Sequence, residues 1–313
     1  MQKLLTPPVD GLKPVLVTGT PGPSPPPMPG RSSAFTTAFG CPREFLGNRF
    51  VYVVISSRAR GLSIGVNMNP DQRCDFDCPY CEVNREPPVR EKSLEVDVMA
   101  AELEETLALA HAGRLRDLPA YRQAPDELLK LRHVTLSGDG EPTLCPNFVA
   151  VVHTVIHVRA LGKFPFFKIV LITNATGLDL PPVRQGLEFF TAQDEVWAKL
   201  DAGTQAYMNR VNGPDCSLEK ALANILSLAR RRPVVIQSLF PLLNGCEPPP
   251  QEIAQYVQRL KKLKERGAQI PLVQIYSARR PTPLSDCSHL PLRSLSRIAQ
   301  TVRNDTGLKA EVF

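Results

Sequence analysis

The stretch Arg73-Cys74-Asp75-Phe76-Asp77-Cys78-Pro79-Tyr80-Cys81 places three cysteines on one short loop, with the spacing C-x3-C-x2-C. Three thiolates on such a loop are suited to bind three irons of a cubane cluster and leave the fourth iron open. An open coordination position permits chemistry, whereas structural metal sites are closed. The alternative is a zinc-binding, non-catalytic protein, which requires a fourth Cys or His, and His111 is the nearest downstream histidine.

The other five cysteines lie singly along the chain, at Cys41, Cys145, Cys216, Cys246 and Cys287. In a reducing compartment, closely spaced cysteines are more often metal ligands than disulfides. An isolated cysteine usually behaves as a small buried hydrophobic residue. We therefore expect one cluster on Cys74, Cys78 and Cys81, and a second cluster on the scattered cysteines stays an open alternative.

Outward from this loop, short apolar runs alternate with amphipathic helical patterns. Strands are predicted at residues 63–67, 133–136, 168–172, 195–200, 234–236 and 272–276, with a further apolar run at 50–55. Helices are predicted at residues 96–110, 149–161, 183–190, 218–229, 253–263 and 292–302. This alternation predicts βαβ units, so the fold class is α/β, with a parallel sheet forming a partial (β/α)6 TIM-like barrel. Chemistry in such folds collects at the carboxyl ends of the strands.

Composition predicts three regions and a cytoplasmic protein. Residues 1–35 are rich in Pro and Gly and have no periodic apolar face, which predicts a disordered tail. Residues 36–285 form the predicted core domain, and residues 286–313 a C-terminal helix and tail packed on the barrel. No apolar run approaches the roughly 20 residues that cross a bilayer, and the opening lacks a signal peptide. The net charge of +6 is compatible with a polyanionic substrate without requiring one.

Three polar segments follow predicted strands. The segment Ser137-Gly138-Asp139-Gly140-Glu141-Pro142-Thr143-Leu144 contains glycines that allow close approach of the backbone to a ligand, although alone it reads as a polar turn. The segment Thr173-Asn174-Ala175-Thr176-Gly177 reads either as a ligand-binding turn or simply as a helix N-cap or a plain turn. Lys199 and Asp201 are two residues apart and point to one side of an extended chain, where a plain salt bridge is the alternative.

Together these motifs resemble the radical S-adenosylmethionine (SAM) superfamily, in which an aromatic residue, here Tyr80, precedes the third cysteine. The resemblance implies one 4Fe-4S cluster on Cys74, Cys78 and Cys81, with SAM chelated to the open iron. It implies an oxidoreductase-type enzyme that cleaves SAM reductively to a 5′-deoxyadenosyl radical, which abstracts hydrogen from a substrate. A ferredoxin or flavodoxin is the implied electron donor.

The same resemblance implies the cofactor-binding positions. They are Tyr80, Gly138, Asp139, Gly140, Glu141, Asn174, Lys199, Asp201, Gln237 and Tyr276. The loop at 138–141 resembles the G-G-E-type loop that holds the amino group of SAM, with Asp139 where many members have Gly. The partner of that amino group is therefore Asp139, Glu141 or the backbone. Lys199 and Asp201 are expected at the ribose or carboxylate of SAM, and the last two positions at the edge of the nucleoside.

Two stretches, residues 56–67 and residues 140–144, look like the wyosine-synthetase-related group, and this resemblance spans residues 45–285. Its best-known members rebuild a modified guanine in tRNA with pyruvate. This chain departs from them, because only Cys41 precedes the cysteine loop and no flavodoxin-like domain is recognisable. It also lacks a basic stripe interleaved with aromatic residues. We expect a relative with an unassigned substrate, and tRNA modification is the alternative.

Overall fold

The computed structural model describes residues 45–83, 85, 88–278 and 286–313, so the predicted tail at residues 1–35 and Cys41 lie outside the described residues. One sheet of eight strands has the order β1-β2-β3-β4-β5-β6-β8-β10. Its strands are β1 (Val51–Ser56), β2 (Gly61–Asn67), β3 (Leu131–Ser137), β4 (Lys168–Thr173), β5 (Glu195–Lys199), β6 (Val234–Leu239), β8 (Val273–Tyr276) and β10 (Ala310–Val312).

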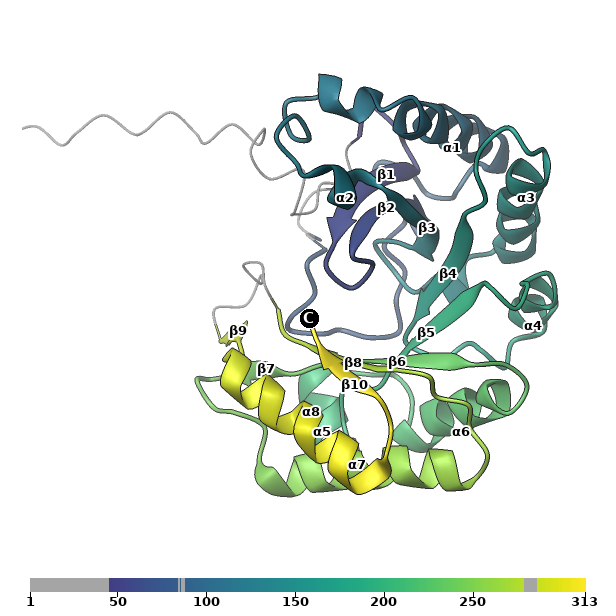
Figure 1. Cartoon of the computed structure of the whole chain (residues 1–313). Helices are drawn as coiled ribbons and strands as arrows, with labels where there is room; N and C mark the ends of the chain where they lie inside the picture. The colour runs from purple at the N-terminus through teal and green to yellow at the C-terminus, as the bar shows by residue number, and fades with distance from the viewer. Residues whose placement is uncertain (1–44, 84, 86–87, 279–285) are drawn as a thin grey trace, which may run out of the picture. The chain divides into compact units, whose positions relative to one another are not determined.

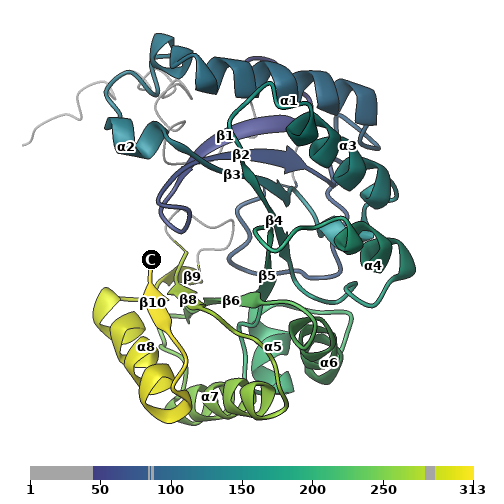
Figure 2. The ribbon, with the colours of Figure 1, turned by 45° about the vertical axis from the view of Figure 1, so that its right-hand side comes forward.

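The six predicted strands are β2, β3, β4, β5, β6 and β8, and each pairs in parallel with the next. The fold-class prediction is therefore confirmed. The further apolar run at 50–55 is the edge strand β1, which pairs antiparallel with β2. The structure adds β10 at the other edge, where it pairs in parallel with β8. Figures 1 and 2 show the sheet curving from β1 to β10 as an incomplete barrel.

Helices cover the outer side of the curved sheet (Figures 1 and 2). They are α1 (Val96–His111), α3 (Phe148–Ala160), α4 (Pro181–Glu188), α6 (Leu218–Ala229), α7 (Pro250–Glu265) and α8 (Leu292–Thr306). Shorter helices are η2 (Arg114–Asp117), α2 (Asp126–Leu129), η3 (Pro142–Leu144) and α5 (Gln205–Val211). The α1 helix buries Met99, Leu103 and Leu107, the stripe that its sequence pattern predicts.

The two faces of the sheet differ in character. Ile169 and Leu171 of β4 belong to the main core, which the helices cover. On the concave face, Val170, Trp197 and Val235 form a small cluster of their own. Polar pairs also lie between the strands, with 2.6 Å between the Ser63 and Thr135 hydroxyls and 2.8 Å between the Gln237 and Gln274 amides. Closed barrels are usually filled by branched apolar side chains, so this concave face is unusually polar.

Residues after β6 form a second, two-stranded antiparallel sheet, β7 (Pro241–Leu243) with β9 (Cys287–His289). Cys145 and Cys287 are buried, as expected of isolated cysteines, and Cys216 is half-buried. Cys246 is exposed, contrary to that expectation, because it lies in the turn that follows β7. No helix in the described part of the chain is long and apolar enough to cross a membrane.

Candidate functional site

The cysteine loop follows β2 at the carboxyl ends of the parallel strands and lies against the loop that follows β3. The Glu141 amide donates a hydrogen bond of 2.9 Å to the Arg73 carbonyl, which fixes the start of the cysteine loop. A Cβ atom on Gly140 would lie 2.0 Å from the same Arg73 oxygen. Glycine is therefore required at position 140, because any side chain would separate the two loops.

The loop after β4 holds the cysteine loop at a second point. The Asn174 side-chain amide donates a 2.6 Å hydrogen bond to the Asp75 carboxylate. Its oxygen accepts hydrogen bonds from the Thr176 amide at 3.0 Å and the Thr176 hydroxyl at 2.8 Å. Residue Ala175 between them has a φ of +70°. This segment is therefore a tight turn, as one interpretation expected, and the turn aims Asn174 at the cysteine loop.

The segment after α5 holds the loop at a third point. The Asp77 amide donates to the Asn212 carbonyl at 2.8 Å, and the Asp215 amide donates to the Asp75 carbonyl at 3.0 Å. The Asn212 side-chain nitrogen lies 3.5 Å from Cys78 Sγ, 2.7 Å from the Tyr80 hydroxyl and 2.9 Å from Asp201 Oδ2. Sequence reasoning missed Asn212, since its only local signal is an Asn-Gly pair, which reads as a turn.

Tyr80, Lys199 and Asp201 meet in a buried cluster beside the second cysteine, Cys78. The Tyr80 hydroxyl donates a hydrogen bond to the Asp201 carboxylate. Lys199 Nζ lies 3.2 Å from Asp201 Oδ2 and 5.0 Å from the centre of the Tyr80 ring. Burial alone would lower the pKa of Lys199, but the Asp201 charge holds it above its usual value. The salt bridge that was the alternative interpretation of Lys199 and Asp201 is thus present, and Asp201 also accepts the hydrogen bond of the Tyr80 hydroxyl.

The Glu141 carboxylate is buried and accepts hydrogen bonds from two loops. It accepts from the Thr143 amide at 3.1 Å, the Thr143 hydroxyl at 2.7 Å, the Thr173 hydroxyl at 2.5 Å and the Asn174 amide at 2.8 Å. Burial raises the pKa of Glu141 above its usual value, and these donors oppose that shift. Glu141 therefore fastens the loop after β3 to the loop after β4.

Gly138, Asp139 and Gly140 are half-buried and border the cysteine loop. The Asp139 amide donates to Asn67 Oδ1 at 2.9 Å, and Asp139 Oδ2 accepts from Asn67 Nδ2 at 2.7 Å. A Cβ atom on Gly138 would lie 2.3 Å from Asn67 Oδ1. The end of β2 therefore sets the position of this segment.

The last two predicted site residues lie on the concave face of the sheet. Gln237 is buried and donates to Gln274. The Tyr276 hydroxyl accepts a 3.4 Å hydrogen bond from Lys199. Tyr276 thus joins the buried cluster, whereas Gln237 lies beside it on the neighbouring strand. Contact of these residues with SAM stays a prediction.

Two of the three thiols, those of Cys74 and Cys78, have N–H groups close to the sulfur atom. Cys74 Sγ accepts from the Phe76 amide at 3.4 Å, and Cys78 Sγ is in contact with the Asn212 amide. Such N–H groups aimed at sulfur tune iron-sulfur clusters. Burial raises the pKa of Cys74 to about 12 and that of Cys78 to about 11. Within the described residues, no three His, Cys, Asp or Glu side chains surround a position for a single metal ion.

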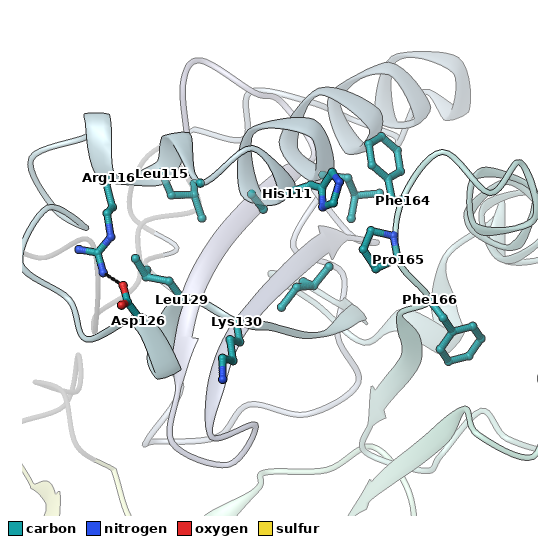
Figure 3. Close-up of a pocket in the computed structure, with 13 residues that line it drawn as sticks. His111, Leu115, Arg116, Asp126, Leu129, Lys130, Phe164, Pro165 and Phe166 are labelled. Atoms are coloured by element: carbon teal, nitrogen blue, oxygen red, sulfur yellow. Dashed lines mark hydrogen bonds and ion pairs between the residues drawn. The ribbon is translucent and has the colours of Figure 1, made fainter.

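An apolar cavity of about 370 Å³ lies apart from this site, among the end of α1, the η2–α2 segment and the loop before β4 (Figure 3). Phe164 and Phe166 border it, and 58% of Phe166 is exposed. Arg116 and Asp126 form an ion pair at its other end. The cavity shares no lining residue with the cysteine loop.

Known proteins resemble this chain in sequence and in fold. No family model matches the chain. A UPF0026 protein of Helicobacter pylori is 24% identical over 270 residues, which cover 80% of this chain and 79% of the relative. A UPF0026 protein of Synechocystis is 28% identical over 170 residues, which cover 54% of each chain.

Solved structures show the same fold. A structure of TYW1 with a lysine-pyruvate adduct has a TM-score of 0.55 at 16% identity, covering 85% of this chain and 87% of that one. A radical SAM methyltransferase from Sphaerobacter thermophilus has a TM-score of 0.56 at 16% identity, covering 84% and 68%. Streptococcus suis SuiB bound to S-adenosylmethionine has a TM-score of 0.53 at 15% identity, covering 78% and 49%. The chain therefore has the fold of the radical SAM superfamily, and TYW1 is among the structures that it resembles.

Proposed function

We propose that this protein is a radical SAM enzyme that binds one 4Fe-4S cluster on Cys74, Cys78 and Cys81. The observation that carries the proposal is the anchoring of the cysteine loop at three points, by the segments that follow β3, β4 and α5. When bound and reduced, the cluster supplies one electron that breaks the C5′–S bond of SAM, which yields methionine and, after hydrogen abstraction, 5′-deoxyadenosine. A ferredoxin or flavodoxin is the proposed electron donor.

The residues of the chain would bind, orient and shield the cofactor. The backbone and carboxylate at 138–139 border the cysteine loop and would receive the amino group of SAM. Tyr80 is held rigidly by Asp201 and Asn212, so its ring is a fixed wall directly before Cys81. Lys199 is the cation of the buried group formed with Tyr80 and Asp201, and it would face the carboxylate or ribose of SAM.

Anaerobic reconstitution with iron and sulfide tests the proposal. The expected product is a brown protein with about four irons per chain. Reduction with dithionite should produce a paramagnetic centre, and added SAM should be converted to 5′-deoxyadenosine. The Cys78→Ala variant should lose both signals, and the Cys246→Ala variant, which removes an exposed cysteine, should keep them. A colourless protein with stoichiometric zinc and no SAM cleavage would contradict the proposal.

Modification of tRNA is the second candidate function, and the fold shared with TYW1 supports it. It requires a steep dependence of tRNA binding on salt, because neutralised phosphates release counterions. Titration of the reconstituted protein with bulk tRNA at several salt concentrations measures that dependence. Binding that is absent or insensitive to salt would exclude this candidate without affecting SAM cleavage.

A further inference from the structure

A cavity of about 910 Å³ opens at the amino-terminal ends of β3, β4, β5, β6 and β8. Because these strands are parallel, this end of the barrel is opposite to the end that carries the cysteine loop. A volume of several hundred Å³ is typical of pockets for small molecules. The lining includes Arg58 from the β1–β2 turn, His133 from β3 and Trp197 from β5.

Two residues that line this cavity each have a buried polar atom with no hydrogen-bond partner among the described residues. The two atoms are His133 Nδ1 and Arg58 Nε, and only 2% of His133 is exposed. Buried polar atoms in folded proteins almost always have a partner in protein, water or ligand. Only four such atoms occur in the described part of the chain, and two of them belong to residues that line this one cavity. The cavity therefore has unused hydrogen-bonding capacity.

The charge of Arg58 also lacks an acidic partner within the described residues. Its guanidinium lies over the Tyr276 ring, 4.3 Å from the ring centre. The other Lys and Arg side chains on the cavity differ, because each forms an ion pair with a glutamate: Arg60, Arg132, Lys168 and Lys309. A half-buried arginine with no carboxylate partner is suited to bind a carboxylate or phosphate.

An apolar wall faces these polar groups. Trp197 and Val235 belong to the small concave cluster, with Leu272 packed against them. The Trp197 ring meets the His133 ring edge to face, with 5.4 Å between the ring centres. The cavity lining thus combines an arginine and a histidine with a largely buried indole, of which 3% is exposed. Small-molecule pockets commonly combine apolar walls with a few polar groups.

We propose that this cavity binds a small organic anion. Its carboxylate or phosphate pairs with Arg58 and hydrogen-bonds His133, and its planar or apolar part lies against Trp197. Tyr276 contacts Arg58 on one side and Lys199 on the other, so it links the anion site to the buried cluster beside the cysteine loop. Binding of the anion does not depend on the proposed function.

Fluorescence of the full-length protein tests the proposal, because Trp197 is the single tryptophan of the chain. Three matched probes are benzoate, phenyl phosphate and the uncharged benzamide. At least one anionic probe should change the Trp197 emission with saturation, and benzamide should bind much more weakly. Saturation by benzoate identifies a carboxylate site and saturation by phenyl phosphate a phosphate site. Equal binding of benzamide, or no saturable response to either anion, would overturn the proposal.

Substitutions locate the binding. The Arg58→Gln variant should weaken binding of the anionic probe by roughly tenfold to a hundredfold, as expected for loss of a charge-assisted hydrogen bond. Arg58→Lys should recover part of the affinity because it keeps the charge. The control Arg114→Gln makes the same change in net charge at an exposed arginine outside the cavity and should leave binding unchanged. Full affinity in Arg58→Gln, with an unchanged thermal transition, would refute the site.

The result of this binding test does not depend on the iron-sulfur cluster. The Cys78→Ala variant should bind the anionic probe with wild-type affinity, because Cys78 does not line this cavity. Loss of SAM cleavage with retained anion binding would therefore contradict only the proposed function. Retained SAM cleavage without anion binding would contradict only this inference.

Discussion

Asn212 is the residue on which the most contacts of the candidate site converge. One amide nitrogen contacts a cysteine sulfur, a tyrosine hydroxyl and an aspartate, and the same residue's carbonyl accepts from the cysteine loop. A buried polar group that loses its hydrogen-bond partner retains the full free-energy cost of desolvation. A network in which every polar group is hydrogen-bonded is rigid. The side chain of Asn212 is thus a positioning device for Cys78 and Tyr80.

Replacing Asn212 with Ala should destabilise the protein by about 1–3 kcal/mol, since Tyr80 and Asp201 lose a buried donor. It should also reduce the iron retained after reconstitution. Urea unfolding and iron analysis measure the two effects. The control Asn304→Ala removes an exposed amide that contacts only Gln300 and should change neither. Wild-type stability and iron content in Asn212→Ala would contradict this role.

His133 makes the stability of the fold depend on pH. Burial, together with the charges of Lys168 and Arg58, lowers the pKa of His133 from 6.5 to about 3. Above pH 6.5 the imidazole is neutral in both states. Below it, the unfolded chain gains a proton that the folded protein rejects until about pH 3, so stability falls through this window. From pH 7 to pH 5 this effect amounts to about 2 kcal/mol.

Urea unfolding at pH 7 and pH 5 measures that effect against the His133→Gln variant, which cannot titrate at this position. The wild type should lose about 2 kcal/mol more than the variant over this interval. Equal losses in the two proteins would show that His133 is accessible to protons in the folded state.

Among the elements, the loops that follow the strands hold the site more than the strands themselves. The segments after β3, β4 and α5 each contribute hydrogen bonds to the cysteine loop, and Glu141 joins two of them. Most of these contacts involve backbone groups, so they form only when the backbones of neighbouring loops lie close together. Gly140 is the position where that approach is tightest.

Gly140→Ala should therefore displace the cysteine loop and prevent stable cluster binding while the barrel stays folded. A suitable control is Gly113→Ala, where φ is +70° but no atom lies within 4 Å of the added Cβ. The control should lose only about 1 kcal/mol of stability. Iron content and the thermal transition of both variants measure the difference. A normal iron content in Gly140→Ala would show that the two loops can separate freely.

The elements also show what sequence could and could not predict. The strands β2 to β6 and β8 were predictable because each is a short segment rich in apolar and β-branched residues, and the cysteine spacing alone located the site. The strand β10 is three residues long, Ala-Glu-Val, and has no periodicity to detect. The helix α5 is also short, and its N-cap Thr204 was not recognised. Asn212, Arg58 and His133 became visible only through tertiary contacts, which no local pattern encodes.

At the scale of the whole molecule, one ion pair links the β1–β2 turn to β10, the strand at the opposite edge of the open sheet. Arg60 of the β1–β2 turn forms a 2.7 Å ion pair with Glu311 of β10. The pair is exposed at Arg60, so it contributes little by itself. The attachment of β10 depends more on its backbone pairing with β8 and on the buried side chain of Ala310.

Deleting residues 308–313 should thus lower the unfolding transition clearly, because β8 loses its outer partner and the α8 helix loses contacts. The charge variant Glu311→Gln should shift the transition only slightly, as expected for a surface ion pair. Circular dichroism melts of both proteins compare the two contributions. A truncated protein that melts with the wild type would show that β10 is dispensable.

The order of strands across the large sheet is also their order along the chain, from β1 at one edge to β10 at the other. Each strand can therefore pair with a neighbour that has already left the ribosome. No strand of this sheet has to insert later between two strands that are already in place. Pairings between sequence neighbours form faster than distant ones. Growth from one edge should keep only a single unpaired strand exposed at any moment during synthesis, which limits the opportunity for aggregation.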